Sequence, residues 1–355
     1  MSRFLSRKFA GVEPYVPGEQ PRGGSFLKLN TNENPYPPSP RVLNALSRGE
    51  AKKLHLYSDP AAAGLVGAIA ARFGLAPENV FVGNGSDEVL AFSFLAFGGD
   101  APFLCPALSY GFYPVFARLL GARYEAVPLR EDFSLDAEAF VGCGKNVVIA
   151  NPNAPTGLAV SRQTVRRIAR SNPDRVVVID EAYVDFGGES AVPLVPECDN
   201  LLVVQTFSKS RALAGMRIGF ALGNPALIAD LNTMKFSFNP YNLDRLALLA
   251  GQAAIADEEY LADCTRRICA TRAKTAAALR ALGFAVTDSK ANFLFVRPRG
   301  ISGPALFAAL RARGVLVRRW DDPEISDWLR VTIGSEDEMA RFVAVTGEIL
   351  QEVAR

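Results

Sequence analysis

The sequence is poor in the residues on which many enzymes depend. It contains one histidine, His55, among 355 residues. This leaves little room for a histidine-based nucleophilic triad and almost none for a multi-histidine metal site. The five cysteines are odd in number, scattered and never in a C-x-x-C pair, so we expect free thiols in a reducing compartment. If the protein is an enzyme, another residue type moves its protons.

Charge imbalance and long apolar runs are also lacking. Lysine and arginine exceed aspartate and glutamate by only two, 39 against 37, and charged residues make up 21% of the chain. This near balance argues against nucleic acid as a partner, and no apolar run is long enough to span a bilayer. We therefore expect a cytoplasmic protein whose partners are small molecules or copies of itself.

From about residue 78 the chain repeats a short apolar run followed by a polar turn, the pattern of buried parallel strands. The clearest runs cover residues 80–82, 146–150, 176–179, 201–204 and 218–222. Helical patterns separate several of them, and a helix over 60–73, capped by Asp59, precedes them. The pattern predicts an α/β fold with a large domain whose mostly parallel sheet is flanked by helices.

The last third of the chain predicts a smaller α+β domain. A helical stretch from about 244 to 282 precedes a strand over 292–297, a helix that ends before Gly314 and a strand over 315–318. Ser335 and Glu338 form a capping box at the start of the final helix. With a boundary near residue 245, we expect an N-terminal arm with part of the small domain, a large domain and a small domain, over 1–50, 51–245 and 246–355.

Polar residues follow several of the expected strands, and in open α/β sheets ligands bind at the carboxyl ends of strands. The segment 83–88, Gly-Asn-Gly-Ser-Asp-Glu, suits a phosphate through free N–H groups at a helix start. Alone it fits an ordinary turn equally well, and Glu88 stands where a dinucleotide fingerprint has its third glycine. Asp180 follows another strand, where a buried carboxylate needs a cation, a metal or several donors, or else caps a helix.

A third strand end carries Lys209, between Ser208 and Ser210, and Arg217 follows eight residues later. A lysine in this setting can form a Schiff base while the arginine and the hydroxyl groups hold a phosphate. Pyridoxal 5′-phosphate requires an amine for its aldehyde, an anion cradle for its phosphate and a carboxylate for its ring nitrogen. Together with Asp180, these residues predict that cofactor.

With these residues, the sequence resembles the fold type I pyridoxal-phosphate-dependent aminotransferases, and within them the histidinol-phosphate aminotransferase group. The segment 30–35, Asn-Thr-Asn-Glu-Asn-Pro, narrows the resemblance to that group. The resemblance covers nearly the whole chain, and its other specific segments are 14–18, 57–60, 83–88, 151–157, 180–183, 206–209 and 329–334.

The resemblance implies a role for each residue around the cofactor ring. Lys209 would be the Schiff-base lysine and would move the proton between Cα and the C4′ atom. Asp180 would keep the ring nitrogen protonated, Tyr183 would bond the phenolic oxygen, and Tyr110 would stack on the ring. The family commonly has an asparagine before Pro-Thr-Gly where this chain has Ala154, so either Asn153 replaces it or Tyr183 holds the oxygen alone.

The resemblance also implies phosphate and substrate contacts. Tyr57 would reach the phosphate of the neighbouring subunit, which implies a homodimer with shared sites. Arg330 would clamp a substrate carboxylate in two parallel hydrogen bonds, and Arg318, rather than Arg319, is preferred for the distal anion. Trp320 and Trp328 are interpreted as packing residues. The phosphate would be surrounded by Ser86, Asp87, Thr206, Ser208 and Arg217, and the substrate would meet Tyr15 and Asn32 of the arm.

The implied activity is transfer of the amino group of L-histidinol phosphate to 2-oxoglutarate, which gives imidazole acetol phosphate and L-glutamate in histidine biosynthesis. An aromatic amino acid aminotransferase and a decarboxylase of the threonine-phosphate type share most of these motifs and remain alternatives. A regulator that only binds the cofactor is disfavoured, because residues 1–30 are too short and proline-rich for a helix-turn-helix module. An NAD dehydrogenase would leave Lys209 and Arg217 unexplained and conflicts with Glu88.

Overall fold

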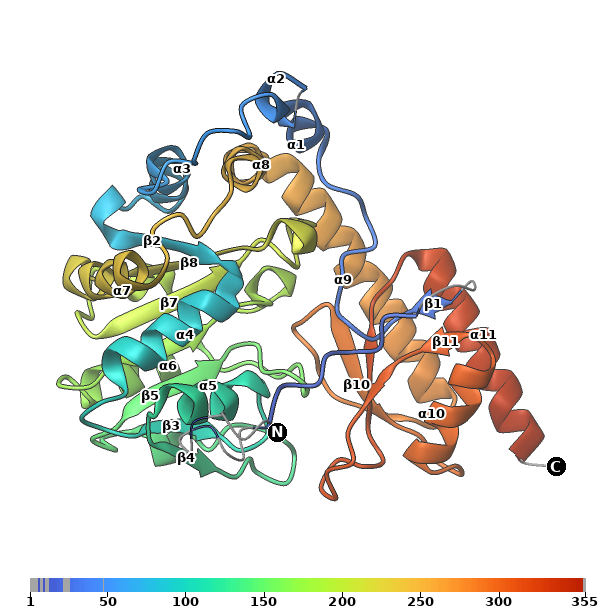
Figure 1. The fold of residues 1–355 in the computed structure, drawn as a ribbon. Coiled ribbons are helices and arrows are strands. Elements are labelled where there is room, and N and C mark those ends of the chain that lie inside the picture. Colours follow the sequence, from blue (N-terminus) through green and yellow to red (C-terminus); the bar gives the residue numbers. More distant parts are fainter. Residues whose placement is uncertain (1–5, 7–8, 10–12, 22–25, 47, 354–355) are drawn as a thin grey trace.

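The computed structural model describes residues 6, 9, 13–21, 26–46 and 48–353, which fold into a large and a small part (Figure 1). A seven-stranded sheet forms the centre of the large part. Its strands, in spatial order, are β2 (Val80–Asn84), β8 (Ile218–Gly223), β7 (Leu201–Thr206), β6 (Val177–Asp180), β5 (Asn146–Ala150), β3 (Phe103–Pro106) and β4 (Tyr124–Val127).

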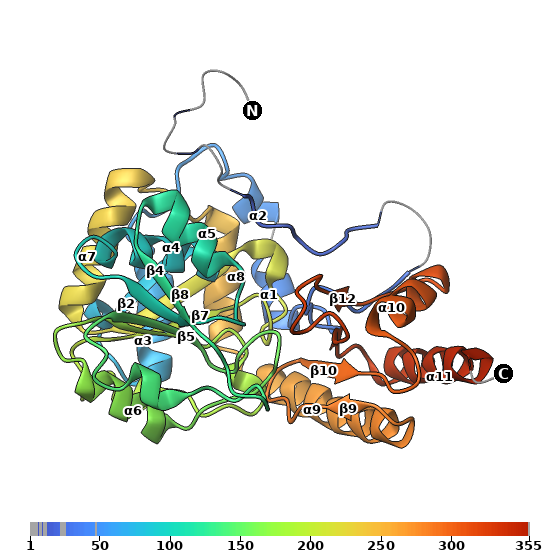
Figure 2. The ribbon, with the colours of Figure 1, turned by 90° about the horizontal axis from the view of Figure 1, so that it is seen from below.

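The sheet is parallel from β7 to β4, and only β8 runs antiparallel to its neighbours in this sheet of the described chain. Every residue of β5, β6 and β7 is buried, because helices cover both faces (Figure 2). On one face pack α3 (Ala63–Phe73), α6 (Arg162–Ser171) and α8 (Arg245–Ile255), and on the other α4 (Gly85–Phe97), α5 (Phe112–Leu120) and α7 (Pro225–Phe238). The predicted fold class is confirmed.

The helix expected over 60–73 begins later, at Ala63. The Asp59 carboxylate accepts hydrogen bonds from the backbone N–H groups of Ala61 and Ala63, at 3.0 and 2.7 Å, so it does act as a cap just before the helix. Ala62, however, has φ 50°, a left-handed conformation that is incompatible with a helix interior. Asp59 therefore caps a turn that leads into the helix.

The helical stretch expected over 244–282 is two helices, because the chain turns at Asp257 between α8 and α9 (Glu258–Ala281). Helix α8 packs on α3 and on α1 (Pro40–Ala45), which belong to the large part. Helix α9 packs on α11 (Glu336–Val353) of the small part. We therefore propose that the boundary lies near Asp257 rather than near residue 245, and that residues 40–45 belong to the large part.

The small part is built on a four-stranded antiparallel sheet and a two-stranded parallel pair. The capping box of α11 forms as predicted, with Ser335 N donating to Glu338 Oε2 at 2.7 Å. The strands are β12 (Arg318–Arg319), β13 (Leu329–Thr332), β10 (Phe293–Arg297) and β9 (Ala285–Val286), with β1 (Leu27–Lys28) beside β11 (Val315–Leu316), and α10 (Gly303–Ala312) packs on them.

Short helices lie in the connections, and none of the described helices is both long and apolar enough to cross a membrane. They are α2 (Arg48–Ala51) and the 3-10 helices η2 (Pro77–Asn79), η3 (Ala137–Phe140), η4 (Val184–Phe186), η5 (Val192–Leu194) and η6 (Ala214–Met216).

The N-terminal arm joins the two parts. Its strand β1 pairs with β11 of the small part, whereas the Tyr15 ring stacks on Phe112 of the large part with centroids 4.2 Å apart. Farther along, Asn34 Nδ2 donates to the backbone oxygen of Lys209 at 3.0 Å. The arm thus passes directly over the carboxyl ends of the central strands (Figure 1).

Candidate active site

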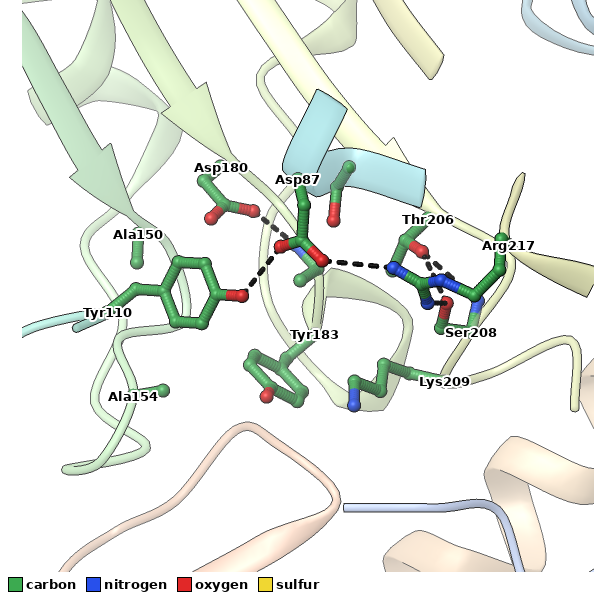
Figure 3. A pocket seen from close by; sticks show the side chains of 12 residues that line it. Asp87, Tyr110, Ala150, Ala154, Asp180, Tyr183, Thr206, Ser208, Lys209 and Arg217 are labelled. Atoms are coloured by element: carbon green, nitrogen blue, oxygen red, sulfur yellow. Dashed lines mark hydrogen bonds and ion pairs between the residues drawn. The ribbon is translucent and has the colours of Figure 1, made fainter. Parts of the chain in front are cut away.

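The ends of β5, β6 and β7 and the start of α4 surround one pocket (Figure 3). Parallel strands bring their carboxyl ends to the same edge of the sheet, which is why residues far apart in sequence meet here. The pocket is lined by Ser86, Asp87, Tyr110, Ala150, Ala154, Asp180, Ala182, Tyr183, Thr206, Ser208, Lys209 and Arg217.

One end of the pocket is an anion cradle at the N-terminus of α4, where the first N–H groups of a helix lack intrahelical partners. The approach of α4 to β8 requires glycine, because a Cβ atom at Gly219 would lie 2.2 Å from the backbone nitrogen of Ser86. Arg217 Nη2 pairs with Asp87 Oδ2 at 2.9 Å, and its Nη1 donates to Ser208 Oγ at 3.4 Å. Helix end, hydroxyl and guanidinium together fit a phosphate.

Asp180 closes the pocket at the end of β6 and is only 3% exposed. Burial raises the pKa of its carboxyl group to about 6, although Tyr113 and the backbone of Ala182 donate hydrogen bonds to it at 2.9 and 3.2 Å. A carboxylate in such a place is stabilised by a cationic partner. The protonated ring nitrogen of pyridoxal 5′-phosphate is such a partner.

Lys209 enters the pocket from the loop after β7. Its Nζ donates to the backbone oxygen of Thr31 at 3.3 Å and lies 5.9 Å from the centre of the Tyr183 ring. Burial, helped by the charge of Arg330, lowers the pKa of the Lys209 amine to about 8. The Tyr183 hydroxyl accepts a hydrogen bond from Asn32 Nδ2 at 3.0 Å. Amine and phenol therefore lie side by side in the pocket (Figure 3).

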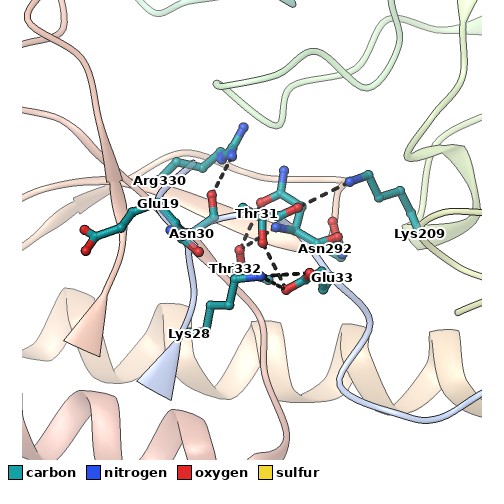
Figure 4. A network of polar contacts seen from close by, with 10 residues as sticks. Glu19, Lys28, Asn30, Thr31, Glu33, Lys209, Asn292, Arg330 and Thr332 are labelled. Atoms are coloured by element: carbon teal, nitrogen blue, oxygen red, sulfur yellow. Dashed lines mark hydrogen bonds and ion pairs between the residues drawn. The ribbon is translucent and has the colours of Figure 1, made fainter. Parts of the chain in front are cut away.

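A second cleft opens from this pocket toward the small part, and Arg330 of β13 lies in it. Its Nη2 donates to the backbone oxygen of Asn30 at 3.0 Å (Figure 4), and its guanidinium lies 5.4 Å from the ring centres of both Phe293 and Trp320. The buried Nε has no hydrogen-bond partner among the described residues. An unpaired donor on a guanidinium that lines a cleft is suited to an anionic substrate group.

Of the two arginines that form β12, Arg318 lines this cleft. It donates to the backbone oxygens of Val16 and Pro17 at 2.8 and 3.1 Å, which ties the arm to the small part. Arg319 instead pairs with Asp321 at 2.6 Å, outside the residues that line the cleft. The position of the side chains supports Arg318 as the candidate for the distal anion.

Tyr15 and Asn32, the two arm residues expected to contact the substrate, both line the cleft, but they differ in how far their side chains are buried. Tyr15 is partly exposed beside Phe112. Asn32 is buried, and besides its bond to Tyr183 its Oδ1 accepts from Thr332 Oγ1 at 3.0 Å. Asn32 therefore orients the Tyr183 hydroxyl rather than presenting a free amide to a ligand.

Of the two alternatives for the phenolic oxygen, Asn153 or Tyr183 alone, the structure does not support Asn153, which does not line this pocket. Its Oδ1 accepts from Ser109 Oγ at 2.7 Å, and its Nδ2 donates to Leu108 O and Thr156 Oγ1 at 3.1 and 3.0 Å. These bonds turn the amide into the loop, and Ala154 lines the pocket instead. Tyr183 therefore remains the candidate for the phenolic oxygen.

Two other residues lie away from the pocket of their own chain. Tyr57 is 79% exposed and stacks on Tyr241 with centroids 4.5 Å apart. His55 is exposed and its Nδ1 lies 3.0 Å from the backbone oxygen of Lys52.

The structure also places Tyr113 at the site, where its hydroxyl contacts Asp180, and the sequence interpretation missed this residue. Its place three residues after Tyr110 gave no usable signal, because α5 begins only at Phe112 and Tyr110 lies before the helix.

Comparison with known proteins decides the family. The family model described as aminotransferase class I and II matches residues 25–345. The chain belongs to this family. It is 52% identical over 351 residues to histidinol-phosphate aminotransferase 1 of Bradyrhizobium diazoefficiens, covering 99% of this chain and 100% of that protein. It is 49% identical over 344 residues to histidinol-phosphate aminotransferase of Clostridium acetobutylicum, covering 97% and 98%.

A solved structure agrees with this assignment. Histidinol-phosphate aminotransferase from Sinorhizobium meliloti, in complex with pyridoxal-5′-phosphate, superposes with a TM-score of 0.88 at 25% identity and covers 99% of each chain. The predicted family, aminotransferase class and cofactor are confirmed. The protein is a pyridoxal-phosphate-dependent enzyme, and the buried Asp180, the Lys209 amine and the anion cradle fit that cofactor.

Proposed function

We propose that the enzyme transfers the amino group of L-histidinol phosphate to 2-oxoglutarate, forming imidazole acetol phosphate and L-glutamate in histidine biosynthesis. The observation that carries the proposal is the pair Arg330 and Arg318 in one cleft beside the Lys209 pocket, where the Nε of Arg330 has no hydrogen-bond partner among the described residues. The donor has a phosphate and the acceptor has two carboxylates, so both need such a cationic cleft. Relatives about half identical to this chain carry the corresponding name.

When bound, pyridoxal 5′-phosphate supplies a carbonyl carbon that accepts the amino group and a ring that withdraws electrons from the substrate Cα. In our proposal Asp180 holds the ring nitrogen, Tyr183 holds the phenolic oxygen, and Tyr110, whose hydroxyl donates to Asp87 Oδ1 at 2.6 Å, flanks the ring. The phosphate is bound by the backbone N–H groups of Ser86 and Asp87 and by the side chains of Thr206, Ser208 and Arg217.

Lys209 is proposed to be the catalytic base. A buried amine with a pKa of about 8 is neutral in a larger fraction near physiological pH than an ordinary lysine, so it can take the proton from the substrate Cα and deliver it to the C4′ atom of the cofactor. The bond from Lys209 Nζ to the Thr31 oxygen fixes the amine beside the arm. The same arm residues, 30–32, contact Arg330, Lys209 and Tyr183, and so help to exclude water from the reacting atoms.

We also propose a homodimer with shared sites, working in the cytoplasm. Tyr57 and Tyr241 form an exposed aromatic pair, and Phe238 nearby in sequence is 75% exposed. Exposed rings of this kind are suited to burial against a second copy of the chain. Tyr57 would then reach the phosphate in the neighbouring pocket. The cysteines are unpaired thiols, which fits a reducing compartment.

A panel of amino donors tests the proposed activity. Purified enzyme is incubated with 2-oxoglutarate and with L-histidinol phosphate, phenylalanine, tyrosine or aspartate, and the glutamate formed is measured. We expect the highest kcat/KM with histidinol phosphate, because its phosphate meets the arginines of the cleft. A higher value with phenylalanine or tyrosine would indicate an aromatic aminotransferase, and release of carbon dioxide from threonine phosphate would indicate a decarboxylase.

A further inference from the structure

Tyr113 is a fully buried residue that touches the carboxyl group proposed to hold the cofactor ring nitrogen. It lies in the first turn of α5, and none of its surface is exposed. Its hydroxyl group donates a hydrogen bond to Asp180 Oδ2 at 2.9 Å. A buried phenol needs an acceptor, and the end of β6 supplies one.

The ring of Tyr113 is held in place by its neighbours. It packs edge-on against Tyr110, with centroids 5.6 Å apart and planes at 84°, and stacks on Phe94 at 6.5 Å. Tyr110 in turn donates to Asp87 of the anion cradle. The same short segment therefore presents one hydroxyl to the phosphate end of the pocket and another to the ring-nitrogen end.

The donors to Asp180 bind different oxygens of the carboxyl group. Tyr113 binds Oδ2, and the backbone N–H of Ala182 binds Oδ1 at 3.2 Å. Burial and the negative charge of Asp87 favour the neutral carboxyl group, whereas both donors and the charge of Lys209 favour the ionised one. Burial raises the pKa of Tyr113 as well, so its hydroxyl keeps its proton and remains a donor.

We propose that Tyr113 is a positioning residue that holds the Asp180 carboxylate ionised and in a fixed plane for the ring nitrogen of the cofactor. The inference rests on the proposed role of Asp180. An ionised carboxylate keeps the ring nitrogen protonated, and a neutral one does not. Tyr113 thus affects the reaction through Asp180 without touching cofactor or substrate.

The test compares two ligands in two proteins. Wild-type and Tyr113→Phe apoenzyme are titrated with pyridoxal 5′-phosphate and with its 1-deaza analogue, in which carbon replaces the ring nitrogen, and dissociation constants are read from absorption. We expect Tyr113→Phe to weaken binding of the natural cofactor about tenfold and to leave binding of the analogue within about twofold. The variant should also lower kcat with little change in the KM for the donor.

Tyr124→Phe is the matched control. Its hydroxyl interacts with the buried Cys105 thiol on the neighbouring strand rather than with Asp180, so both dissociation constants should stay at wild-type values. If Tyr113→Phe does not fold, Tyr113→Leu also lacks the hydroxyl and allows the same comparison of ligands within one protein.

The possible outcomes distinguish the role of Tyr113 from the role of Asp180 on which it depends. If Tyr113→Phe weakens the cofactor and the analogue equally, the residue has only a structural role and the inference is overturned. If the wild-type protein itself binds both ligands equally tightly, the proposed contact between Asp180 and the ring nitrogen is wrong. A loss confined to the natural cofactor supports both.

Discussion

Arg330 is half-buried and combines an unpaired donor with aromatic rings on two sides, which makes it sensitive to small changes. We expect Arg330→Lys to lower kcat/KM for histidinol phosphate about a hundredfold, because an ammonium group cannot form two parallel bonds to an anion. Most of the loss should appear as a raised KM, while the visible absorption of the bound cofactor remains. Steady-state kinetics and an absorption spectrum measure both.

Arg319→Lys is the control for that variant. The Arg319 guanidinium pairs with Asp321 and donates to the Ser326 oxygen at 2.8 Å outside the cleft, so kinetics close to wild type are expected. Equal losses from both substitutions would mean that the sheet, rather than the substrate contact, is disturbed. Unchanged kinetics of Arg330→Lys would remove Arg330 from the substrate site.

The Lys209 amine gives a prediction on pH. An amine must be neutral to react with an aldehyde, and burial lowers the pKa of Lys209 to about 8. The rate at which apoenzyme captures pyridoxal 5′-phosphate should therefore rise with pH and level off above about 8 to 9. Stopped-flow absorption from pH 6 to 10 measures this rate. A rate that keeps rising to pH 10 would indicate an ordinary, solvated lysine.

Among the site residues, those at strand ends could be predicted from the sequence, whereas those whose role depends on the direction of the side chain could not. Lys209 and Asp180 meet because parallel strands share one carboxyl edge, and Arg217 joins them because the antiparallel strand β8 begins at that edge. Asn153 was one of two alternatives for the phenolic oxygen, yet its bonds to residues 108 and 109 turn its amide away from the pocket. Tyr113 was missed because the sequence does not show that the first turn of α5 faces the end of β6.

Among the secondary-structure elements, the contact between β8 and α4 gives a prediction. A Cβ atom at Gly219 would lie 2.2 Å from Ser86 N and 2.4 Å from Gly85 C, both backbone atoms, so α4 must move. Gly219→Ala should therefore weaken cofactor binding at least about tenfold, because the helix end that binds the phosphate is displaced. Gly215→Ala, where a Cβ atom meets nothing within 4 Å, is the control. Titration of apoenzyme measures the affinity, and equal affinities of the two variants would contradict a role of this contact in phosphate binding.

Element types were easier to predict than element limits. The strand at 146–150 was found at its observed bounds because all five of its residues are buried and the four after Asn146 form a continuous apolar run. The break at Asp257 was missed because Ala-rich sequence continues on both sides of it, and the turn depends on α8 and α9 packing on different parts of the molecule.

For the whole molecule, the important feature is that the catalytic and substrate-binding residues lie in different parts. Lys209 and Asp180 belong to the large part, and Arg330 and Arg318 belong to strands of the small part. The arm contacts both, since Thr31 accepts from Lys209 and its neighbour Asn30 accepts from Arg330 (Figure 4). Local sequence patterns predicted the two parts, but not that the arm would bond to both sets of residues.

The last prediction concerns two chains. Because Tyr57 lies outside the pocket of its own chain, we expect it to serve the pocket of the partner. Lys209→Ala and Tyr57→Ala homodimers should each bind cofactor poorly, but a mixed dimer holds one pocket with both residues intact. With random pairing, an equal mixture should regain about a quarter of the wild-type sites.

Absorption at limiting cofactor, before and after the two variants are refolded together, measures the regained sites. A mixture of Lys209→Ala with Asp180→Ala should regain none, because both residues line the pocket of the same chain and every mixed dimer then has two defective pockets. If the Tyr57 mixture behaved like this control, Tyr57 would not act across an interface, and the proposed shared site would be wrong even if the enzyme were dimeric. Recovery in the Tyr57 mixture alone would support a pocket that is complete only when two chains associate.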